Sequence, residues 1–364
     1  MSCASFLDNR DSAPVQTAKK SKIALVGLKL EELESILSEF SEPSFRGQQL
    51  FEWLYRSRVD SFDQMGNLPS DFRNALSEKF IIHPLKEVHV TGSSSEPTQK
   101  FLFELQSGEK VESVLMKEGK RTTLCISSQV GCAVNCDFCA TASMGFQKNL
   151  SVGEIVDQFL HVRRAAKTNI TNVVFMGMGE PFLNYNRVIA AADLMNAEKG
   201  IKLGAKRITI STVGITSKIK RYTEERHRYK LAISLNGSSQ KSRLQTMPIA
   251  KKYPLEELLT VIDNYSLTSR HPVTLEYVLM AGITDNIDDA LKLIDMLTGH
   301  RCKLNVIPYN DIGGKYKRPA DDVIETFINT LKKAPFPVTV RWSKGTDIAA
   351  GCGQLAVMES SVIN

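Results

Sequence analysis

Long apolar runs are absent from this sequence, and so is an apolar stretch near its start. No run approaches the roughly 18 apolar residues that a membrane-spanning helix needs, so no membrane partner is expected. The first residues, MSCASFLDNRDSAPVQTAKKSK, hold no apolar core of the kind that a signal peptide requires. No fixed-period repeat or low-complexity tract is present. These absences predict a cytoplasmic protein.

Cysteine is scarce and odd in number, with seven residues in a chain of 364. That count does not fit a disulfide framework. In a reducing compartment, clustered cysteines favour metal binding or catalysis over structural bridges. Three of the seven, Cys132, Cys136 and Cys139, lie together in the segment GCAVNCDFCATASMGF.

A strong charge of either sign is also missing. The formal net charge is +6 at pH 7, a mild basic excess that permits an RNA partner without establishing one. Apolar residues make up 42% of the chain and charged residues 24%, as in an ordinary globular protein.

The first third of the chain divides into three parts. Residues 1–21 are polar and lack periodicity, which predicts a disordered tail. Residues 22–85 contain LKLEELESILSEF and FRGQQLFEWLY, whose apolar residues recur at spacings of three and four, so a small helical domain is expected. Residues 86–117 alternate apolar and polar side chains around a Ser-Gly turn and predict a β-hairpin linker or a small meander.

Strand and helix patterns alternate through residues 118–348. Strands are expected at 122–128, 171–176, 207–212, 230–235, 273–280, 303–308 and 338–342. Helices are expected to begin near Ser151, Tyr185, Ile215, Pro254, Ile287 and Ala320. This alternation predicts an α/β fold, a partial (β/α)6-type barrel, with a doubly wound open sheet as the alternative. In either fold the chemistry is expected at the carboxyl ends of the strands.

The three clustered cysteines follow the first of these strands with the spacing C-x3-C-x2-C. Structural zinc takes four closed ligands, so a zinc site would need Cys125, Cys302, Cys352 or a histidine as the fourth. The alternative is a [4Fe–4S] cluster with three irons on thiolates and one iron open. The spacing, with Phe138 before the third cysteine, resembles the radical SAM superfamily, whose open iron binds S-adenosylmethionine.

Polar residues end several other expected strands, at MGMGEP, STVG, SLNG and VIPYN. Under the same resemblance these positions are expected to contact S-adenosylmethionine, and the MGMGEP turn looks like the superfamily's glycine–glutamate motif. The candidate contacts are Gly179, Glu180, Ser211, Ser234, Leu235, Asn236 and Asn310.

Taken together, TLCISSQVGCAVNCDFCATASMGF, GMGEP, MPIAKKYPLEEL, VIPYN and GTDIAAGCGQL resemble the RlmN family of radical SAM RNA methyltransferases. The likeness covers the chain after about residue 28. It departs from the family pattern at Ala142, Ser143 and Gly351, none of which has a chemical role. The resemblance implies that the C-terminal segment, residues 349–364, carries a methyl-accepting cysteine, Cys352.

The resemblance also implies a mechanism. One of two S-adenosylmethionine molecules per turnover methylates Cys352, and the second yields a radical that removes hydrogen from this methyl group. The carbon radical adds to C2 of adenine. Cys125 then removes the C2 proton and releases the product by forming a transient disulfide with Cys352. Glu112, in KVESVLM, matches the family's proton acceptor, although by its residue pattern alone it is a solvent-facing strand glutamate.

The family's substrates are an adenosine of 23S rRNA near the peptidyl-transferase centre and adenosine 37 of certain tRNAs. The resemblance further implies a flavodoxin-type electron donor and a monomer. The candidate RNA-binding stretches are basic: 19–22, Arg163–Arg164, 218–230, Lys251–Lys252 and 315–318. A solvated helix face explains residues 218–230 equally well.

Three other functions remain open at this stage. A Cfr-type enzyme would use the same cysteines to methylate C8 of the ribosomal adenine and confer antibiotic resistance. A non-catalytic, zinc-bound RNA-binding protein is a different class. A radical SAM reaction on a small molecule would require neither Cys125 nor Cys352.

Overall fold

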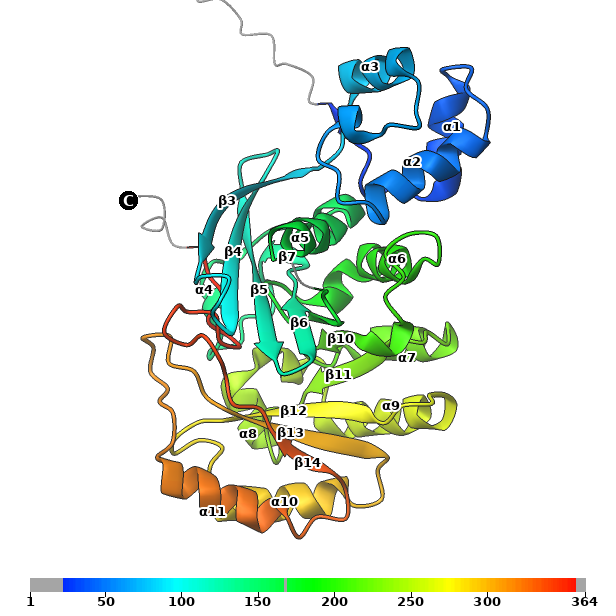
Figure 1. The fold of residues 1–364 in the computed structure, drawn as a ribbon. Helices are drawn as coiled ribbons and strands as arrows, with labels where there is room; N and C mark the ends of the chain where they lie inside the picture. Colours follow the sequence, from blue (N-terminus) through cyan, green and yellow to red (C-terminus); the bar gives the residue numbers. More distant parts are fainter. Residues whose placement is uncertain (1–21, 167–168, 358–364) are drawn as a thin grey trace, which may run out of the picture.

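The computed structural model describes residues 22–166 and 169–357 (Figure 1). The expected tail, residues 1–21, and the last residues of the C-terminal segment lie outside these ranges. Within them, no helix combines the length and the apolar composition that crossing a bilayer takes.

One ten-stranded sheet organises the molecule, in the order β14-β13-β12-β11-β10-β9-β6-β5-β4-β3. Seven of its strands are parallel. They are β6 (Arg121–Cys125), β9 (Asn172–Phe175), β10 (Ile208–Thr212), β11 (Lys230–Ser234), β12 (Val273–Leu279), β13 (Cys302–Pro308) and β14 (Val338–Val340). Their spatial order follows the chain without reversal, whereas a doubly wound sheet reverses at a switch point. The partial barrel predicted from the sequence is confirmed.

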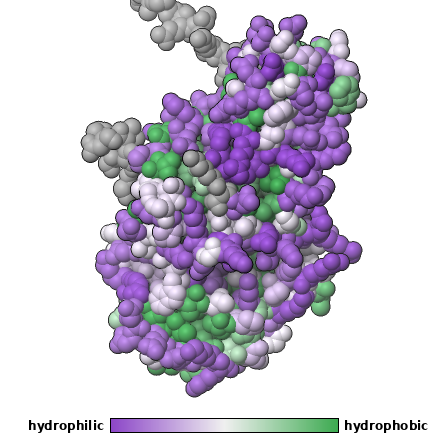
Figure 2. All heavy atoms as spheres, viewed as in Figure 1, coloured by the Kyte–Doolittle hydropathy of each residue, from purple (hydrophilic) through white to green (hydrophobic). Residues whose placement is uncertain are grey.

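Helices connect successive parallel strands and cover the outside of the sheet (Figure 1). They are α5 (Val152–Ala165), α6 (Tyr185–Asn196), α7 (Thr216–Glu224), α8 (Gln240–Thr246), α9 (Leu255–Thr268), α10 (Ile287–Leu297) and α11 (Asp321–Leu331), with 3-10 turns η2 (Pro181–Asn184), η3 (Ala205–Arg207) and η4 (Pro248–Lys251). Figure 2 shows a largely hydrophilic face with apolar side chains gathered low on the molecule, over α10 and α11. On α10, Ile287 and Leu291 are exposed.

The segment expected to form a β-hairpin or small meander contains three strands. β3 (Leu85–Thr91), β4 (Thr98–Leu105) and β5 (Lys110–Glu118) pair antiparallel, and β5 pairs antiparallel with β6. The segment therefore continues the barrel sheet. Burial of Val111, Val114 and Leu115 favours this pairing, because a free hairpin would expose them.

The N-terminal helices are α1 (Leu30–Ser38), α2 (Phe45–Tyr55) and α3 (Ser70–Lys79), with the 3-10 turn η1 (Phe62–Gln64). A small sheet of β1 (Ile23–Ala24) and β2 (Phe80–Ile81) closes this part of the chain. One continuous apolar core joins it to the barrel. Within this part, the Tyr55 hydroxyl accepts from the Gly27 amide and donates to the Leu28 carbonyl, 2.8 and 2.7 Å away, and so ties α2 to the segment before α1.

A buried ionic network crosses the junction between the N-terminal helices and the barrel, and we call it the Asp157 network. Asp157, on α5, accepts hydrogen bonds from His83 Nδ1 at 2.5 Å and from the Leu85 amide at 3.0 Å. His161 lies one helical turn further along, with Nε2 3.5 Å from Asp157 and 3.1 Å from the Leu85 carbonyl. Arg164 contacts a ring nitrogen of each histidine, at 3.1 and 2.9 Å. Since arginine only donates, both of those nitrogens act as acceptors.

Burial opposes the charged form of Asp157, but hydrogen bonds from His161 and His83 outweigh it and hold the pKa of Asp157 below its usual value. Asp157, His83 and His161 are the one group of three potential metal ligands within 4.8 Å of one another in the described part of the chain. Arg164 engages both rings, and a cation at this position opposes a metal ion. The network is therefore a structural tie between the N-terminal helices and the barrel.

Candidate active site

The cysteine loop lies between β7 (Gln129–Gly131) and the short helix α4 (Ala140–Ser143). β7 pairs with β8 (Phe146–Asn149), so both ends of the loop are clasped. The clasp requires glycine at position 131, where φ is +68° and an added Cβ would lie 1.6 Å from the Gly145 carbonyl oxygen. The Cys132 amide donates to the same oxygen at 3.0 Å.

The cysteine-loop cavity, about 140 Å³, opens at the carboxyl ends of the parallel strands. Ten of the residues predicted from the sequence line it. They are Cys132, Cys136, Cys139, Gly179, Glu180, Ser211, Ser234, Asn236, Asn310 and Cys352. Leu235 does not line it, because its side chain is fully buried elsewhere.

A second and larger space, the barrel cavity, measures about 530 Å³ and lies inside the sheet. Cys125 and Cys352 both line it, although they are 227 positions apart in the sequence. Cys352 also lines the cysteine-loop cavity, so this one thiol faces both spaces. A group carried on its sulfur is therefore accessible from either side.

Three backbone carbonyls hold the loop that carries Cys352. The Cys352 carbonyl accepts from Asn310 Nδ2 at 2.8 Å, and the Gly353 carbonyl accepts from the Ala140 amide at 2.7 Å. The Leu355 carbonyl accepts from the Thr141 hydroxyl at 2.6 Å. Two of these donors belong to α4, so the methyl-accepting candidate and the cysteine loop are held as one unit.

Burial governs the thiols of the site. It raises the pKa of Cys125 to about 12. Loss of solvation at the sulfur raises the pKa of Cys352 as well, although the residue as a whole is exposed, and Arg341 favours the thiolate of each. Burial likewise raises the pKa of Cys132 to about 12 and that of Cys136 well above its ordinary value. The cysteines of the loop also repel one another as thiolates, so together they favour a cationic ligand.

Glu112 lies on β5 with its carboxylate 3.0 Å from Lys100 Nζ. The residue is only 4% exposed, so the solvent-facing position indicated by its residue pattern is wrong. Burial raises the pKa of Glu112, and Lys100 and the Ala356 backbone amide oppose that shift. Glu112 lines neither cavity, but its contact with Ala356 places it beside the segment that carries Cys352.

Glu180 organises the mouth of the cysteine-loop cavity. Its two carboxylate oxygens accept from the amides of Phe182 and Val213, each at 2.9 Å, and its own amide donates to Gln129 at 2.8 Å. Burial raises the pKa of Glu180 to about 7 in spite of these hydrogen bonds. Its position allows it to bind a cationic amino group.

Sequence reasoning missed Arg341 and Glu276, which line the barrel cavity beside the two catalytic cysteine candidates. Arg341 donates to Met176 Sδ at 3.3 Å, and Glu276 accepts from Asn305 Nδ2 at 2.6 Å. One signal was present: a charged residue stands within each of the apolar strand patterns VTVRW and VTLEYVLM.

Sequence reasoning also missed Arg243. Nothing in the sequence marks it as buried, because it belongs to the polar helix α8. It is fully buried, and its guanidinium donates to the carbonyls of Leu235, Val213 and Tyr253 at 3.1, 2.6 and 3.1 Å. It thereby fixes two of the strand ends that line the site.

The spread of the three loop thiols discriminates between the metal groups considered above. A single zinc ion binds thiolates at about 2.3 Å and draws its ligands within roughly 4 Å of one another. The cysteine sulfurs do not form a group within 4.8 Å in the described residues, although they share one cavity. Three thiols in this wider arrangement, beside open space, fit an iron–sulfur cluster with a free coordination position.

The fold and this cysteine loop define a radical SAM enzyme, and residues 126–294 match the Radical SAM superfamily. Membership of that superfamily implies S-adenosylmethionine and a [4Fe–4S] cluster. Residues 23–82 match the N-terminal domain of ribosomal RNA large subunit methyltransferases.

Relatives narrow the assignment. The chain is 43% identical over 316 residues to the dual-specificity RNA methyltransferase RlmN of Desulfosudis oleivorans, covering 86% of this chain and 85% of the relative. A probable RlmN of Akkermansia muciniphila is 39% identical, with 89% of this chain and 93% of the relative covered. The crystal structure of a radical SAM methyltransferase from Sphaerobacter thermophilus superposes with a TM-score of 0.89 at 39% identity, over 92% of this chain and 99% of that one. The chain belongs to the RlmN family and is an S-adenosylmethionine-dependent RNA methyltransferase.

Proposed function

We propose that the enzyme methylates carbon C2 of adenosine, in 23S rRNA near the peptidyl-transferase centre and at position 37 of tRNAs. One observation carries the proposal: Cys125 and Cys352 line a single cavity, and Cys352 alone also faces the cysteine loop. Hydrogen abstraction by itself needs neither cysteine, so a small-molecule radical reaction leaves this pair unexplained. The names of the relatives support RNA as the substrate.

Cys132, Cys136 and Cys139 would hold the cluster. Gly179, Glu180, Ser211, Ser234, Asn236 and Asn310 would bind S-adenosylmethionine, because all six line the cavity beside the cysteines. Leu235 is left out of the proposal, since its side chain faces elsewhere. When bound, these groups supply the methyl group and the organic radical, with two S-adenosylmethionine molecules consumed per turnover.

In this proposal the protein's own residues complete the transfer. Cys352 Sγ carries the carbon that becomes the new methyl group and presents it to adenine in the barrel cavity. Cys125 accepts the C2 proton, with Glu112 as a further proton acceptor acting near the same segment. The adduct gives up one electron as it loses this proton. Cys125 Sγ then bonds to Cys352 Sγ, the sulfur–carbon bond of Cys352 breaks with its electron pair on carbon, that carbon takes up a proton, and methylated adenine leaves. Two electrons and two protons from a cellular reductant return this disulfide to two thiols. A flavodoxin-type protein is the electron donor expected for the enzyme.

The remaining parts of the proposal concern the whole chain. Residues 22–85 form an accessory RNA-binding domain, supported by the match of residues 23–82. Residues 86–117 link it to the core of residues 118–348, and residues 349–364 carry Cys352. The enzyme works as a monomer in the cytoplasm, where its RNA substrates are made.

The test is an anaerobic assay with reconstituted protein, a 23S rRNA fragment or tRNA, S-adenosylmethionine and a reductant. Nucleosides are then compared by mass spectrometry with 2-methyladenosine and 8-methyladenosine standards. We expect 2-methyladenosine, and none from the Cys352→Ala control. An 8-methyladenosine product would instead assign Cfr-type chemistry. Iron-loaded protein that cleaves S-adenosylmethionine but methylates no RNA would refute the RNA substrate.

A further inference from the structure

The barrel cavity is lined by charged and polar side chains as well as apolar ones, whereas a packed barrel interior is apolar. Barrels of this type fill their centre with bulky branched side chains. Here the inward face of β6 carries Arg121, Thr123 and Cys125 in alternation, all lining the cavity. β13 contributes Lys303 and Asn305 in the same way. The cavity therefore runs from cations at the amino ends of the strands to the cysteines at the carboxyl ends.

Cations concentrate where the parallel strands begin. Arg121 begins β6, Arg207 immediately precedes β10, Lys230 begins β11 and Lys303 is the second residue of β13. Parallel strands begin at one edge of a sheet, so these side chains meet there although the sequence separates them widely. We call Arg121, Lys206, Arg207, Lys230 and Lys303 the amino-edge rim.

The rim residues are close enough to repel one another. Burial lowers the pKa of Lys230, and so do the charges of Lys303, Arg121, Arg207 and Lys206. Burial and four cations, Lys230 and Lys206 among them, likewise lower the pKa of His271. None of the five rim residues forms an ion pair with a carboxylate in the described part of the chain.

The acidic groups near the rim are already engaged. Glu118 pairs with Lys344 Nζ at 3.4 Å, and Glu276 accepts from Asn305 inside the cavity. Burial raises the pKa of Glu276, whereas the charges of Arg341 and Lys303 lower it, so this carboxylate offsets part of the rim's charge. The rim still keeps an excess of cations, which is costly unless an anion joins them.

An exposed aromatic side chain also lines this cavity, just beyond the carboxyl end of β14. Trp342 lines the barrel cavity, is 55% exposed, and lies 6.0 Å from the Arg318 guanidinium. Exposed tryptophan beside cations is the combination that stacks a base and holds its backbone phosphates. The mouth opposite the rim is less suitable, because the cysteine-loop cavity is only about 140 Å³ and is needed for the cofactors.

We propose that the amino-edge rim binds RNA phosphates and that the target adenosine enters through it, with its base passing up the barrel cavity toward Cys352 and Cys125. This inference rests on the proposed function for the identity of the base. Trp342 stacks on a neighbouring base. A nucleotide must leave its stack to be reached in this way, as for other enzymes that act on a base. The cavity, about 530 Å³, is within the range of small-molecule sites.

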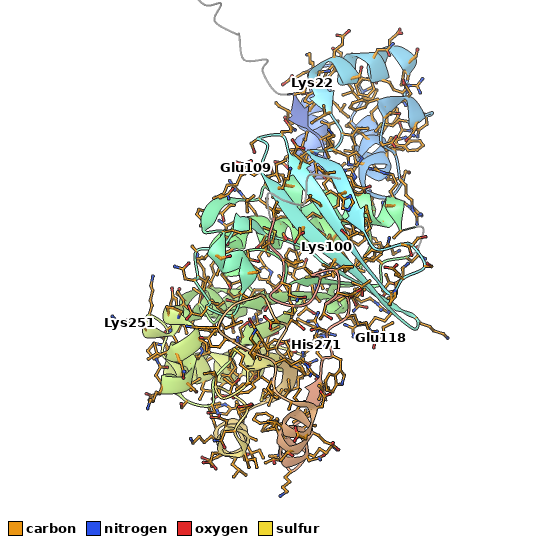
Figure 3. The ribbon with its side chains drawn as sticks, turned by 90° about the vertical axis from the view of Figure 1, so that its left-hand side faces the viewer. Lys22, Lys100, Glu109, Glu118, Lys251 and His271 are labelled. Atoms are coloured by element: carbon orange, nitrogen blue, oxygen red, sulfur yellow. The ribbon has the colours of Figure 1, made fainter. Side chains whose placement is uncertain are left out.

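Lys251 and Lys252 were a candidate RNA-binding stretch in the sequence, so this pair is a rival site of equal charge against which the rim can be compared. Lys251 and Lys252 are both exposed and lie at η4. Glu118 marks the position of the rim, because it pairs with Arg121 between β5 and β6. Figure 3 shows Lys251 on the other side of the barrel from Glu118. We would compare Lys230→Gln/Lys303→Gln with Lys251→Gln/Lys252→Gln, which lose the same charge. Binding of fluorescent tRNA and of a 23S rRNA fragment is measured by anisotropy at several salt concentrations.

Each lost phosphate contact reduces the slope of log affinity against log salt by about 0.7–0.9. The rim variant should lose about 1.4–1.8 in slope, and the rival pair should lose nothing. Trp342→Ala should weaken binding roughly tenfold with an unchanged slope. Equal slopes for the two double variants, or a larger loss in the rival pair, would overturn the proposal.

A second measurement needs no variant. Lysine acetylation of the wild-type protein, with and without RNA, is mapped by mass spectrometry. RNA should protect Lys206, Lys230 and Lys303 and leave Lys251 reactive, and the reverse pattern would reject the rim. Both experiments report binding, so they also separate the two proposals: rim-dependent binding without any methyladenosine would leave the rim intact and refute the reaction.

Discussion

The Asp157 network allows the contribution of one buried carboxylate to be measured. Asp157→Asn keeps the shape of the side chain but replaces one acceptor oxygen by an amide donor, opposite His83 Nδ1 or the Leu85 amide. Leaving a buried hydrogen-bonding group without its partner costs about 1–3 kcal/mol, and more when the lost partner is charged. Because the asparagine retains one acceptor, we expect a loss of about 3 kcal/mol, or a fall in melting temperature of about 6 °C at roughly 2 °C per kcal/mol.

The chain contains a matched control. Asp263 pairs with His300 Nδ1 at 2.6 Å, but its carboxylate is 51% exposed. Such surface pairs contribute up to about 1 kcal/mol, so Asp263→Asn should change stability little. Both variants are compared by thermal and urea unfolding. Limited proteolysis then shows whether the N-terminal helices separate first in Asp157→Asn. Equal losses for the two variants would refute the structural role of the network.

The pH dependence of Asp157 has a definite sign. Its pKa is lowered from 3.8 in the folded state, so its contribution is complete above 3.8 and is lost as the pH falls further through the lowered pKa. The stability difference between wild type and Asp157→Asn should therefore stay constant from about pH 8 to pH 5 and shrink only below about pH 4. A difference that shrinks near neutral pH would contradict this account.

Three further changes test the site. Cys352→Ala should abolish methyl transfer at unchanged iron content, whereas normal RNA methylation by this variant would exclude the two-cysteine reaction. Cys125→Ala should accumulate a protein–RNA adduct, seen as a gel band that RNase shortens, and active, folded protein without the band would argue against Cys125 as the base. Gly131→Ala combines strain with a clash against the Gly145 carbonyl, so reconstituted iron should fall sharply. Gly145→Ala is the control, because its new Cβ meets no atom within 4 Å and only the positive φ is strained, at about 1–3 kcal/mol. Similar iron content in the two variants would therefore refute the clash at position 131.

Local patterns were sufficient for the elements of the barrel. Alternation of apolar and polar residues predicted all seven parallel strands. Capping signals predicted helix starts: the helix expected near Ser151 begins at Val152, and the Ser151 side chain caps it by accepting from the Glu154 amide. Six of the seven S-adenosylmethionine contacts predicted from strand ends line the cysteine-loop cavity, because parallel strands end at one edge.

Features that depend on register were out of reach. The cations of the amino-edge rim come from separate strands, and only the pairing brings Lys230 opposite Thr209 and Lys303 opposite Thr274. The basic pair Arg163–Arg164 was a candidate for RNA binding. In the structure Arg163 donates to the Tyr55 carbonyl at 2.9 Å and connects α5 to α2. Sequence shows the charge of such a residue but not its partner.

The docking of the Cys352 loop on α4 has a consequence during synthesis. The hydrogen bond from Thr141 to the Leu355 carbonyl joins residues 214 positions apart. A ribosome adding about 5–20 residues per second takes roughly 10–40 s to cover that interval. For that time the three thiols of the cysteine loop have left the ribosome while the segment that later covers them has not been made. Oxygen and stray metal ions therefore have their best access to these thiols in the nascent chain rather than in the finished enzyme.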